Sequence, residues 1–353
     1  MAKKITLRQI ARAADVSIPT VSRVMTRSAR VTPSIEKRVR EAASRLGLDM
    51  NCRERRRVVA FLLSNRPITH PFHSEVMSGA EAYCTEHDYQ MLFSTFRYPL
   101  HVRLSQLPLP RLLERPGTVD GYIVAGVNSA RLVELLAQNR LPVAVYGDTL
   151  MEDEFAGVPV VRTDEAGGAM DLTRYLQGLG HTAISFVGNT RQPWFRRRFE
   201  AYSAAMKAVG LEPLLNEFDS EDERQVGYVS TKSILDRDRR ITAIFAGNDH
   251  IAQGVYDALR DRHVRIGQEI SVAGFNDTLE AIILHPTLTT VRVHSEQVGR
   301  KLAELVLAQI ADDASTPRSI TIPTRLIKRE SCGPVAVSES SGLETATDRS
   351  LQR

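Results

Sequence analysis

Near its start the chain reads Thr6-Leu-Arg-Gln-Ile-Ala-Arg-Ala-Ala-Asp-Val-Ser-Ile-Pro-Thr-Val-Ser-Arg-Val-Met25, a stretch that predicts two short helices joined by a tight turn. Apolar and small residues recur at helical spacing on both sides of a break at residues 15–17. Ser17 is placed to cap the second helix, and Asp15 is a residue type that tolerates the positive φ of such a turn. Because a third amphipathic run follows and ends near Gly47, the pattern indicates a helix-turn-helix within a three-helix head.

The charge of this head differs from that of the rest of the chain. Residues 1–57 hold 15 Lys and Arg but only five Asp and Glu, whereas the full 353 residues hold 46 and 42. A basic head on a mildly acidic body indicates that the head binds a polyanion. A basic extension that merely improves solubility is the alternative.

Beyond residue 58 the pattern changes to alternating apolar strands and amphipathic helices. Strands are expected from residues 58–63 to residues 271–275, with helices between them, among them one at residues 104–114. This alternation predicts parallel sheets covered on both faces, and its length favours two similar α/β subdomains over one sheet. The acidic residues Glu221, Asp222 and Glu223 read as solvated loop charges.

Other classes of protein are disfavoured by what the sequence lacks. Its longest apolar runs fall far short of the roughly 18 residues of a spanning helix, and its three cysteines form no CxxC pair, so we expect no membrane insertion, no zinc site and a reducing cytoplasm. The phosphate-binding, zinc-protease and serine-hydrolase signatures are missing from the sequence. We therefore expect no enzyme activity, no cofactor and no metal, and histidines such as His70, His73 and His87 read as loop or surface residues.

The stretch from Thr6 to Met25 resembles the N-terminal signature of lactose-repressor-type (LacI/GalR family) transcription regulators, and Val31-Thr32 falls in the same register. The body follows the family's order and spacing in several further segments: Asp164-Glu-Ala-Gly-Gly168, Leu179-Gly-His181, Asn248-Asp249, Ile270-Ser-Val-Ala-Gly-Phe-Asn-Asp277, Pro286-Thr-Leu-Thr-Thr290 and Leu326-Ile-Lys-Arg-Glu-Ser331. The resemblance covers residues 5–332. It implies an N-terminal all-α helix-turn-helix headpiece and an α/β periplasmic-binding-protein-like (type I) effector domain of two doubly wound subdomains joined by three crossovers.

This resemblance implies the following domain boundaries. A helix-turn-helix DNA-binding domain spans residues 1–50, a shortened basic hinge residues 51–57, and an effector-binding and dimerisation domain residues 58–332. Its N-subdomain takes in about residues 58–161 and 290–317, and its C-subdomain about residues 162–289 and 318–332. Residues 333–353, which are rich in Ser, Thr and Glu, read as a disordered tail without the leucine heptads of a coiled coil.

The head is expected to place its second helix in the major groove of DNA. Arg23 can bond the acceptors of a guanine, whereas Ile18 and Pro19 offer only apolar contact. Short hydroxyl side chains at the helix ends can bind phosphate oxygens, with simple helix capping as the alternative: these are Thr6, Ser17, Thr20, Ser22 and Thr32.

The hinge departs from the family's pattern of a Pro-Asn pair followed by a helix with a leucine wedge. Met50 stands at the proline, Asn51 remains, and Arg57 falls at the wedge position. We expect Asn51 and Arg57 to contact DNA, with the arginines of residues 53–57 on phosphates or in the minor groove and weak central kinking. An ordinary basic linker is the alternative.

The resemblance also implies effector-binding residues. Asp148, Arg198 and Asn248 match positions that bind the effector in sugar-responsive members, and Asn276 replaces the usual aspartate. Three aromatic residues join this expected set: His70, Phe72 and Trp194. Trp194 and its neighbour Phe195 either stack on a sugar or pack in the core. Because basic groups lie near them in the sequence, an acidic or phosphorylated sugar is also an option for the ligand.

Together these patterns predict a sequence-specific DNA-binding regulator, by default a repressor, controlled by a sugar or sugar derivative in the cleft. A homodimer would place its two recognition helices on a near-palindromic double-stranded operator, in the bacterial cytoplasm and on the nucleoid when bound. With the short hinge, we expect the effector to change operator affinity by less than about 100-fold. There are two alternatives: a sugar-binding transport-type protein and an enzyme on an α/β scaffold. A transport-type protein would have no basic head, and the catalytic motif that an enzyme needs is missing from this sequence.

Overall fold

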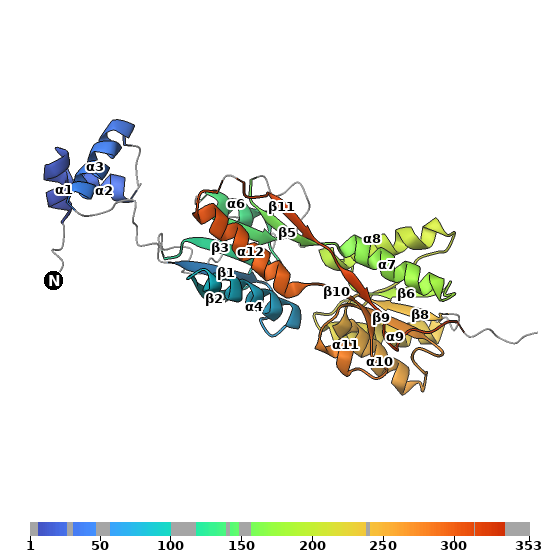
Figure 1. Ribbon diagram of the computed structural model, residues 1–353. Helices are drawn as coiled ribbons and strands as arrows, with labels where there is room; N and C mark the ends of the chain where they lie inside the picture. The colour runs from blue at the N-terminus through green and yellow to red at the C-terminus, as the bar shows by residue number, and fades with distance from the viewer. Residues whose placement is uncertain are drawn as a thin grey trace, which may run out of the picture.

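The computed structural model describes residues 6–26, 31–46, 57–99, 118–138, 142–147, 157–237, 241–313 and 315–335. The head consists of α1 (Leu7–Ala14), α2 (Ile18–Thr26) and α3 (Pro33–Arg45) (Figure 1). Its small core confirms most of the expected apolar positions: Ile10, Ala11, Ala14, Val21, Val24, Val39, Ala42 and Ala43 are buried. Leu7 and Leu46, which share the helical spacing, are exposed instead.

The turn between α1 and α2 has the predicted geometry. Asp15 adopts φ 52°, in the left-handed region, and Ser17 Oγ accepts a hydrogen bond from the backbone N–H of Thr20 at 3.3 Å. Arg38 of α3 also holds the turn, because its guanidinium donates to the carbonyl oxygens of Ala14 at 2.8 Å and Asp15 at 3.0 Å. These bonds help to fix the angle between α1 and α2.

The first subdomain is built on a six-stranded sheet in the order β11-β5-β4-β3-β1-β2, and every pairing in it is parallel. Its strands are β1 (Val58–Ser64), β2 (Gln90–Phe96), β3 (Gly121–Gly126), β4 (Val143–Tyr146), β5 (Val160–Thr163) and β11 (Ser319–Ile322), and its helices are α4 (Pro71–Glu86), α6 (Ala130–Gln138) and α12 (Ser295–Ile310). Helices α4 and α12 lie side by side (Figure 1). Gly79 permits this approach, because a Cβ there would lie 2.0 Å from the carbonyl oxygen of Glu296.

The second subdomain repeats this plan with the order β12-β10-β9-β8-β6-β7, in which only the β10–β12 pair is antiparallel. Its strands are β6 (Ile184–Val187), β7 (Leu214–Asn216), β8 (Ala243–Ala246), β9 (Ser271–Asn276), β10 (Thr289–Arg292) and β12 (Arg325–Ile327), and its helices are α7 (Glu165–Gly178), α8 (Pro193–Ala208), α9 (Glu223–Arg237), α10 (Asp249–Asp261) and α11 (Leu279–Ile283). The expected two α/β subdomains are therefore present.

The chain crosses between the subdomains three times, after β5, after β10 and after β11. Strand β10 pairs within the second sheet and β11 within the first, so the later crossovers lie near residues 293–294 and 323–324. The expected boundaries at residues 290 and 318 are each several residues too early. Strand pairing decides this, and sequence spacing alone does not reveal which sheet a short strand joins.

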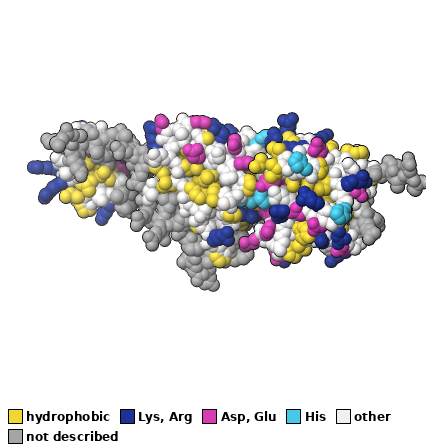
Figure 2. Space-filling model, turned by 90° about the horizontal axis from the view of Figure 1, so that it is seen from below, with side chains coloured by type: hydrophobic (Ala, Val, Ile, Leu, Met, Phe, Trp, Pro, Cys, Tyr) yellow, Lys and Arg dark blue, Asp and Glu magenta, His cyan; other side chains and the backbone are white. Residues whose placement is uncertain are grey.

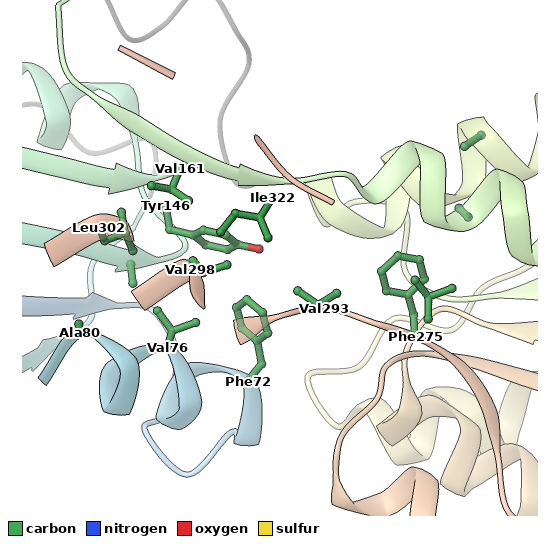
Figure 3. Close-up of a cluster of buried hydrophobic side chains, with 14 of the residues drawn as sticks. Phe72, Val76, Ala80, Tyr146, Val161, Phe275, Val293, Val298, Leu302 and Ile322 are labelled. Atoms are coloured by element: carbon green, nitrogen blue, oxygen red, sulfur yellow. The ribbon is translucent and has the colours of Figure 1, made fainter. Parts of the chain in front are cut away.

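A continuous apolar cluster runs through the crossover region. Figure 3 shows Val293 of the second crossover between Phe72 of the first subdomain and Phe275 of the second. Phe72 also packs against Tyr146, with ring centroids 5.4 Å apart. The two subdomains therefore share buried surface beside the crossovers, which positions the walls of the space between them.

Two further expectations need correction. Helix α9 begins at Glu223, in a region that the apolar pattern left unassigned. Residues 333–335 are ordered rather than part of a disordered tail, because Val335 N–H donates to Leu179 O at 3.0 Å and Gly333 O lies 3.0 Å from His181 Nε2. The helix expected at residues 104–114 and the tail from residue 336 lie outside the described residues. In the described ranges, none of the helices has both the length and the apolar character needed to cross a bilayer.

Candidate functional sites in the head and the cleft

Helix α2 presents one apolar face to the head and the opposite face to solvent. Val21 and Val24 are buried in the head core, while Ile18, Pro19 and Arg23 are exposed. Ile18 is 42% exposed. The three residues expected to read bases are thus all exposed on α2, and Figure 2 shows Lys and Arg side chains projecting from the head.

The hydroxyl side chains around α2 divide into two groups. Thr6 forms a capping box with Gln9, and the side chains of Ser17 and Thr20 hydrogen-bond each other at 2.7 Å. Thr32 is exposed and makes no capping bond to α3, although its hydroxyl lies 3.3 Å from that of Ser34. Helix capping therefore explains why Thr6 and Ser17 stand where they do, and it is compatible with a phosphate contact. Ser22 is half-buried.

Of the expected hinge contacts, Arg57 is described and Asn51 lies outside the described residues. Arg57 adopts φ 52°, its NH1 lies 3.1 Å from Asp88 Oδ2, and its carbonyl accepts a bond from Gln90 N–H at 2.6 Å. The last hinge residue is thus attached to the edge of the first subdomain. Its side chain remains 56% exposed.

The space between the subdomains is a cleft of about 490 Å³, including its open mouth. The cleft brings together all of the expected effector residues that are described, namely His70, Phe72, Trp194, Arg198, Asn248 and Asn276. Asp148 lies outside the described residues. The other lining residues were not among the expected effector residues, although His73 ends a loop, residues 70–73, that was expected near the cleft: Arg66, His73, Gly126, Val127, Tyr146, Glu165 and Glu223.

Arg198 is the most firmly held charge in the cleft. Its side chain is 4% exposed, its Nε bonds Glu165, and its two terminal nitrogens donate to Gly247 O at 2.6 Å and Asn276 Oδ1 at 3.1 Å. The guanidinium also lies 3.8 Å from the ring centre of Phe275. Because Glu165 neutralises it, Arg198 offers directed N–H groups at this wall and little net charge.

Glu165 is held in turn by a short hydrogen-bonded chain. Thr163 Oγ1 donates to Glu165 Oε1 at 2.8 Å, and the hydroxyls of Thr163 and Tyr146 lie 3.2 Å apart. Thr163 ends β5, and Glu165 opens α7, so the first crossover carries this chain from one subdomain to the other. The environment of Arg198 therefore depends on how the subdomains are arranged.

Two asparagines complete the wall of the second subdomain. Asn248 caps α10 by accepting a bond from Ile251 N–H at 2.8 Å and donates through Nδ2 to Glu223 at 2.7 Å. Asn276 has φ 108°, a strained value for a residue other than glycine. Such strain is held only where surrounding contacts fix it, here the bond from Arg198.

A buried carboxyl group supports the two asparagines from behind. Asp249 is completely buried and accepts bonds from the backbone and hydroxyl of Thr278 and from Thr290. Burial raises the pKa of Asp249 to about 7, against the lowering effect of these bonds. Because Asp249 follows Asn248 and bonds the loop that follows Asn276, it fixes these two cleft-lining residues relative to each other.

The two aromatic residues at the start of α8 have separate roles. Phe195 is 1% exposed and belongs to the core of the second subdomain. Trp194 is half-buried and lines the cleft, with the Arg66 guanidinium 4.5 Å from its ring centre. Core packing therefore accounts for Phe195, and only Trp194 is placed to stack on a ligand.

Two sequence interpretations are wrong at the cleft. Glu223 is not a solvated loop charge, because its side chain is only 11% exposed and contacts His70, Arg66 and Asn248. His73 is buried rather than on the surface. Burial first, and then the charges of His70 and Arg66, hold the pKa of His73 well below its ordinary value, so it is a neutral imidazole. Within the described ranges, no His, Cys, Asp and Glu side chains cluster as a metal site.

Comparison with known proteins gives matches over most of the chain. Residues 6–50 match the family described as bacterial regulatory proteins, lacI family, and residues 173–332 match the periplasmic binding protein-like domain. The ribose operon repressor of Haemophilus influenzae is 27% identical over 339 residues, covering 92% of this chain and 98% of its own.

Solved structures with a similar fold include two transcriptional regulators with a bound sugar. A LacI family transcriptional regulator from Enterococcus faecium with bound ribose is 26% identical, with a TM-score of 0.67 over 79% of this chain and 99% of its own. The complex of the transcriptional regulator CelR with cellobiose is 25% identical, with a TM-score of 0.65 over 93% of this chain and 100% of its own. The likeness to CelR extends over nearly the whole chain.

Proposed function

Because the chain belongs to the lacI family of bacterial regulatory proteins, we propose that it represses transcription from an operator and that a sugar bound in the cleft controls this repression. The observation that carries the proposal is the combination, in one chain, of an exposed helix of a helix-turn-helix with a lined cleft between two subdomains. The relatives are regulators, which favours this function over the alternative of a transport-type protein. Its place of action is the cytoplasm, on the nucleoid when it is bound to its operator.

In the proposed complex, α2 enters the major groove. Arg23 bonds a guanine, Ile18 and Pro19 contact bases through apolar groups, and the neighbouring hydroxyls bind phosphates: Thr6, Ser17, Thr20, Ser22 and Thr32. Asn51 and Arg57 contact the DNA between the half-sites. The attachment of Arg57 to Asp88 supports a direct mechanical link between the body and the hinge.

We propose a homodimer as the operator-binding form, since two heads match the two halves of a near-palindromic site. Its support is a set of exposed large apolar side chains on both subdomains, which are Leu92 and Phe93 of β2 and Leu279, Ile282 and Ile283 of α11. Sedimentation velocity should show a dimer that Ile283→Glu weakens. Val209→Glu, at an exposed apolar residue that ends α8, should leave the dimer intact; if both variants stay dimeric, α11 is not the interface.

The effector in this proposal is a sugar held by His70, Phe72, Asp148, Trp194, Arg198, Asn248 and Asn276. Ribose and cellobiose in the two similar structures support this class of ligand. Binding of effector and of operator is reciprocal, so a sugar that weakens operator binding must bind the DNA-bound protein more weakly by the same factor. With the short hinge, that factor stays below about 100.

The test is selection of operator sequences from random duplex DNA by the purified protein, followed by binding of the selected duplex with and without a panel of sugars. Arg23→Ala should weaken operator binding and leave sugar binding intact, and Asn276→Ala should do the reverse. Enrichment of a near-palindromic sequence and a sugar that shifts its affinity are the expected results. If no sequence is enriched, or if no sugar changes the affinity, the proposed function is wrong.

A further inference from the structure

Glu223 lies where the two walls of the cleft meet. Its carboxylate accepts a hydrogen bond from Asn248 Nδ2 at 2.7 Å within the second subdomain. Across the cleft, it lies 3.5 Å from His70 Nε2 and 3.8 Å from Arg66 NH1, both of the first subdomain. Glu223 therefore occupies hydrogen-bond donors and a cation that face the ligand space from both walls.

The groups that Glu223 contacts are themselves fixed in place. Arg66 is 17% exposed and lies over the Trp194 ring, and His70 stacks on His250 of the second subdomain with centroids 5.4 Å apart. Burial alone would raise the pKa of Glu223, but His70, Arg66 and Asn248 outweigh it and hold the pKa at about 2. The carboxylate is therefore ionised under physiological conditions.

The charges of the cleft cancel in pairs. Among the described lining residues, the arginine and glutamate side chains are Arg66, Arg198, Glu165 and Glu223, and each arginine faces one glutamate. A carboxylate or phosphate ligand would have to displace Glu223 or lie beside it, and like charges at such distances repel strongly in a buried site. An uncharged ligand meets no such cost.

The cleft also contains polar atoms that still require a partner. Among the described residues, His70 Nδ1 and His73 Nδ1 are buried without a hydrogen-bond partner, and both residues line the cleft. A buried polar atom without a hydrogen-bond partner destabilises the folded protein, and a ligand that bonds to this atom removes the penalty. A hydroxyl can both donate and accept a hydrogen bond, so hydroxyl groups suit these two nitrogens whether each of them donates or accepts.

We propose that Glu223 determines the specificity of the cleft: its carboxylate occupies the groups that would bind an anion, so the cleft selects an uncharged, hydroxyl-bearing ligand and rejects carboxylates and phosphates. This inference rests on the proposed function, because it names the ligand class of the same cleft. It closes the option of an acidic or phosphorylated sugar that the sequence left open. Removing the charge of Glu223 releases Arg66 and His70 to an anion.

The test uses inorganic phosphate as the probe and the fluorescence of Trp194, the only tryptophan of the chain, as the readout. Wild-type protein, Glu223→Gln and the control Glu212→Gln are titrated, because Glu212 is an exposed acid and its change alters net charge equally. We expect Glu223→Gln to bind phosphate about tenfold or more tightly than the wild type and the control. The added variant Arg66→Gln should abolish this gain.

Equal phosphate binding by wild type and Glu223→Gln would overturn the proposal, as would a gain that Arg66→Gln leaves intact. If Glu223→Gln loses the wild-type circular dichroism spectrum, Glu223→Ala frees the same donors and repeats the test. A panel of neutral sugars titrated in parallel separates the two ideas. Sugar-dependent operator binding without the phosphate contrast rejects only the role of Glu223, whereas the contrast without any sugar response rejects only the proposed function.

Discussion

The arginines of the head and those of the cleft stand in opposite environments. Arg12 and Arg23 are exposed on the head, whereas Arg66 and Arg198 are 17% and 4% exposed and face Glu223 and Glu165. Exposed charges of one sign attract a polyanion from a distance and are weakened by salt. Paired, buried charges cancel at a distance and act only as directed hydrogen-bond groups. One residue type thus suits both the proposed DNA binding by the head and the proposed recognition of an uncharged ligand in the cleft.

The strongest test of this comparison removes a paired arginine. Arg198→Ala leaves Glu165 buried without its cation, which should lower the free energy of unfolding by about 3–5 kcal/mol. The double variant Arg198→Met, Glu165→Gln should recover much of this loss, because no unpaired charge remains. Urea denaturation measures both. Arg191→Ala, which breaks an ion pair whose side chains are 76% and 68% exposed, should change stability by less than about 1 kcal/mol; a similar loss in both single variants would refute the distinction.

The next test is the pH dependence of the Glu223 contact. Since the folded-state pKa is held at about 2, below the ordinary 4.5, the stability that Glu223 contributes is full above pH 4.5 and is lost as pH falls through 2. Wild type should therefore unfold at a higher temperature than Glu223→Gln at neutral pH, and the difference should shrink steadily between these two pH values. A difference that is constant over that range would show that the carboxylate charge is not what stabilises the contact.

A smaller effect is expected for an exposed arginine of the head. Arg23→Ala should cost about 1–3 kcal/mol of operator binding and relax the choice of base at one position in each half-site. Fluorescence anisotropy with operator variants measures this, and the same titrations at several salt concentrations should give a steep negative slope. Sugar binding to the cleft should hardly change over that salt range. Salt dependence of equal size at both sites would remove the contrast between them.

The smallest effect concerns the backbone of the head turn. At φ 52°, Asp15→Gly should stabilise the head by a few tenths of a kcal/mol, up to about 1 kcal/mol, since glycine adopts this region without steric cost. Asp15→Ala should instead destabilise it, because alanine lacks the local hydrogen bonding that makes Asp tolerant. Thermal unfolding of the head followed by circular dichroism gives both values. This effect arises at a single backbone position, whereas the effects at the cleft arise from pairs of residues far apart along the chain.

Sequence reasoning works best where contacts are local. The turn at Asp15 and the cap at Ser17 follow from residues a few positions apart, the core around Val21 follows from helical spacing, and the structure confirms all three. The expected cleft residues came from a resemblance, and those described line one space.

Sequence reasoning fails where partners are distant along the chain. Glu223 looks like any acid in a polar run, and only the fold brings it to Arg66 and His70, more than 150 residues away. The pairing of Arg198 with Glu165 is hidden for the same reason. No periodicity records such contacts, and a strained residue such as Asn276 reveals itself only through its φ of 108°. Charge balance in a buried site is therefore a property of tertiary structure.

The three crossovers also determine when each sheet can be completed during synthesis. A ribosome releases the head first, and its core needs nothing beyond α3. Neither large sheet is complete at that stage, because β11 (residues 319–322) is the last strand to join the first sheet and β12 (residues 325–327) the last to join the second. Until these strands are made, β5 and β10 each lack a neighbouring strand, and both gain it within the last few residues of the fold. A premature stop before residue 319 would leave a complete DNA-reading head on two unfinished sheets.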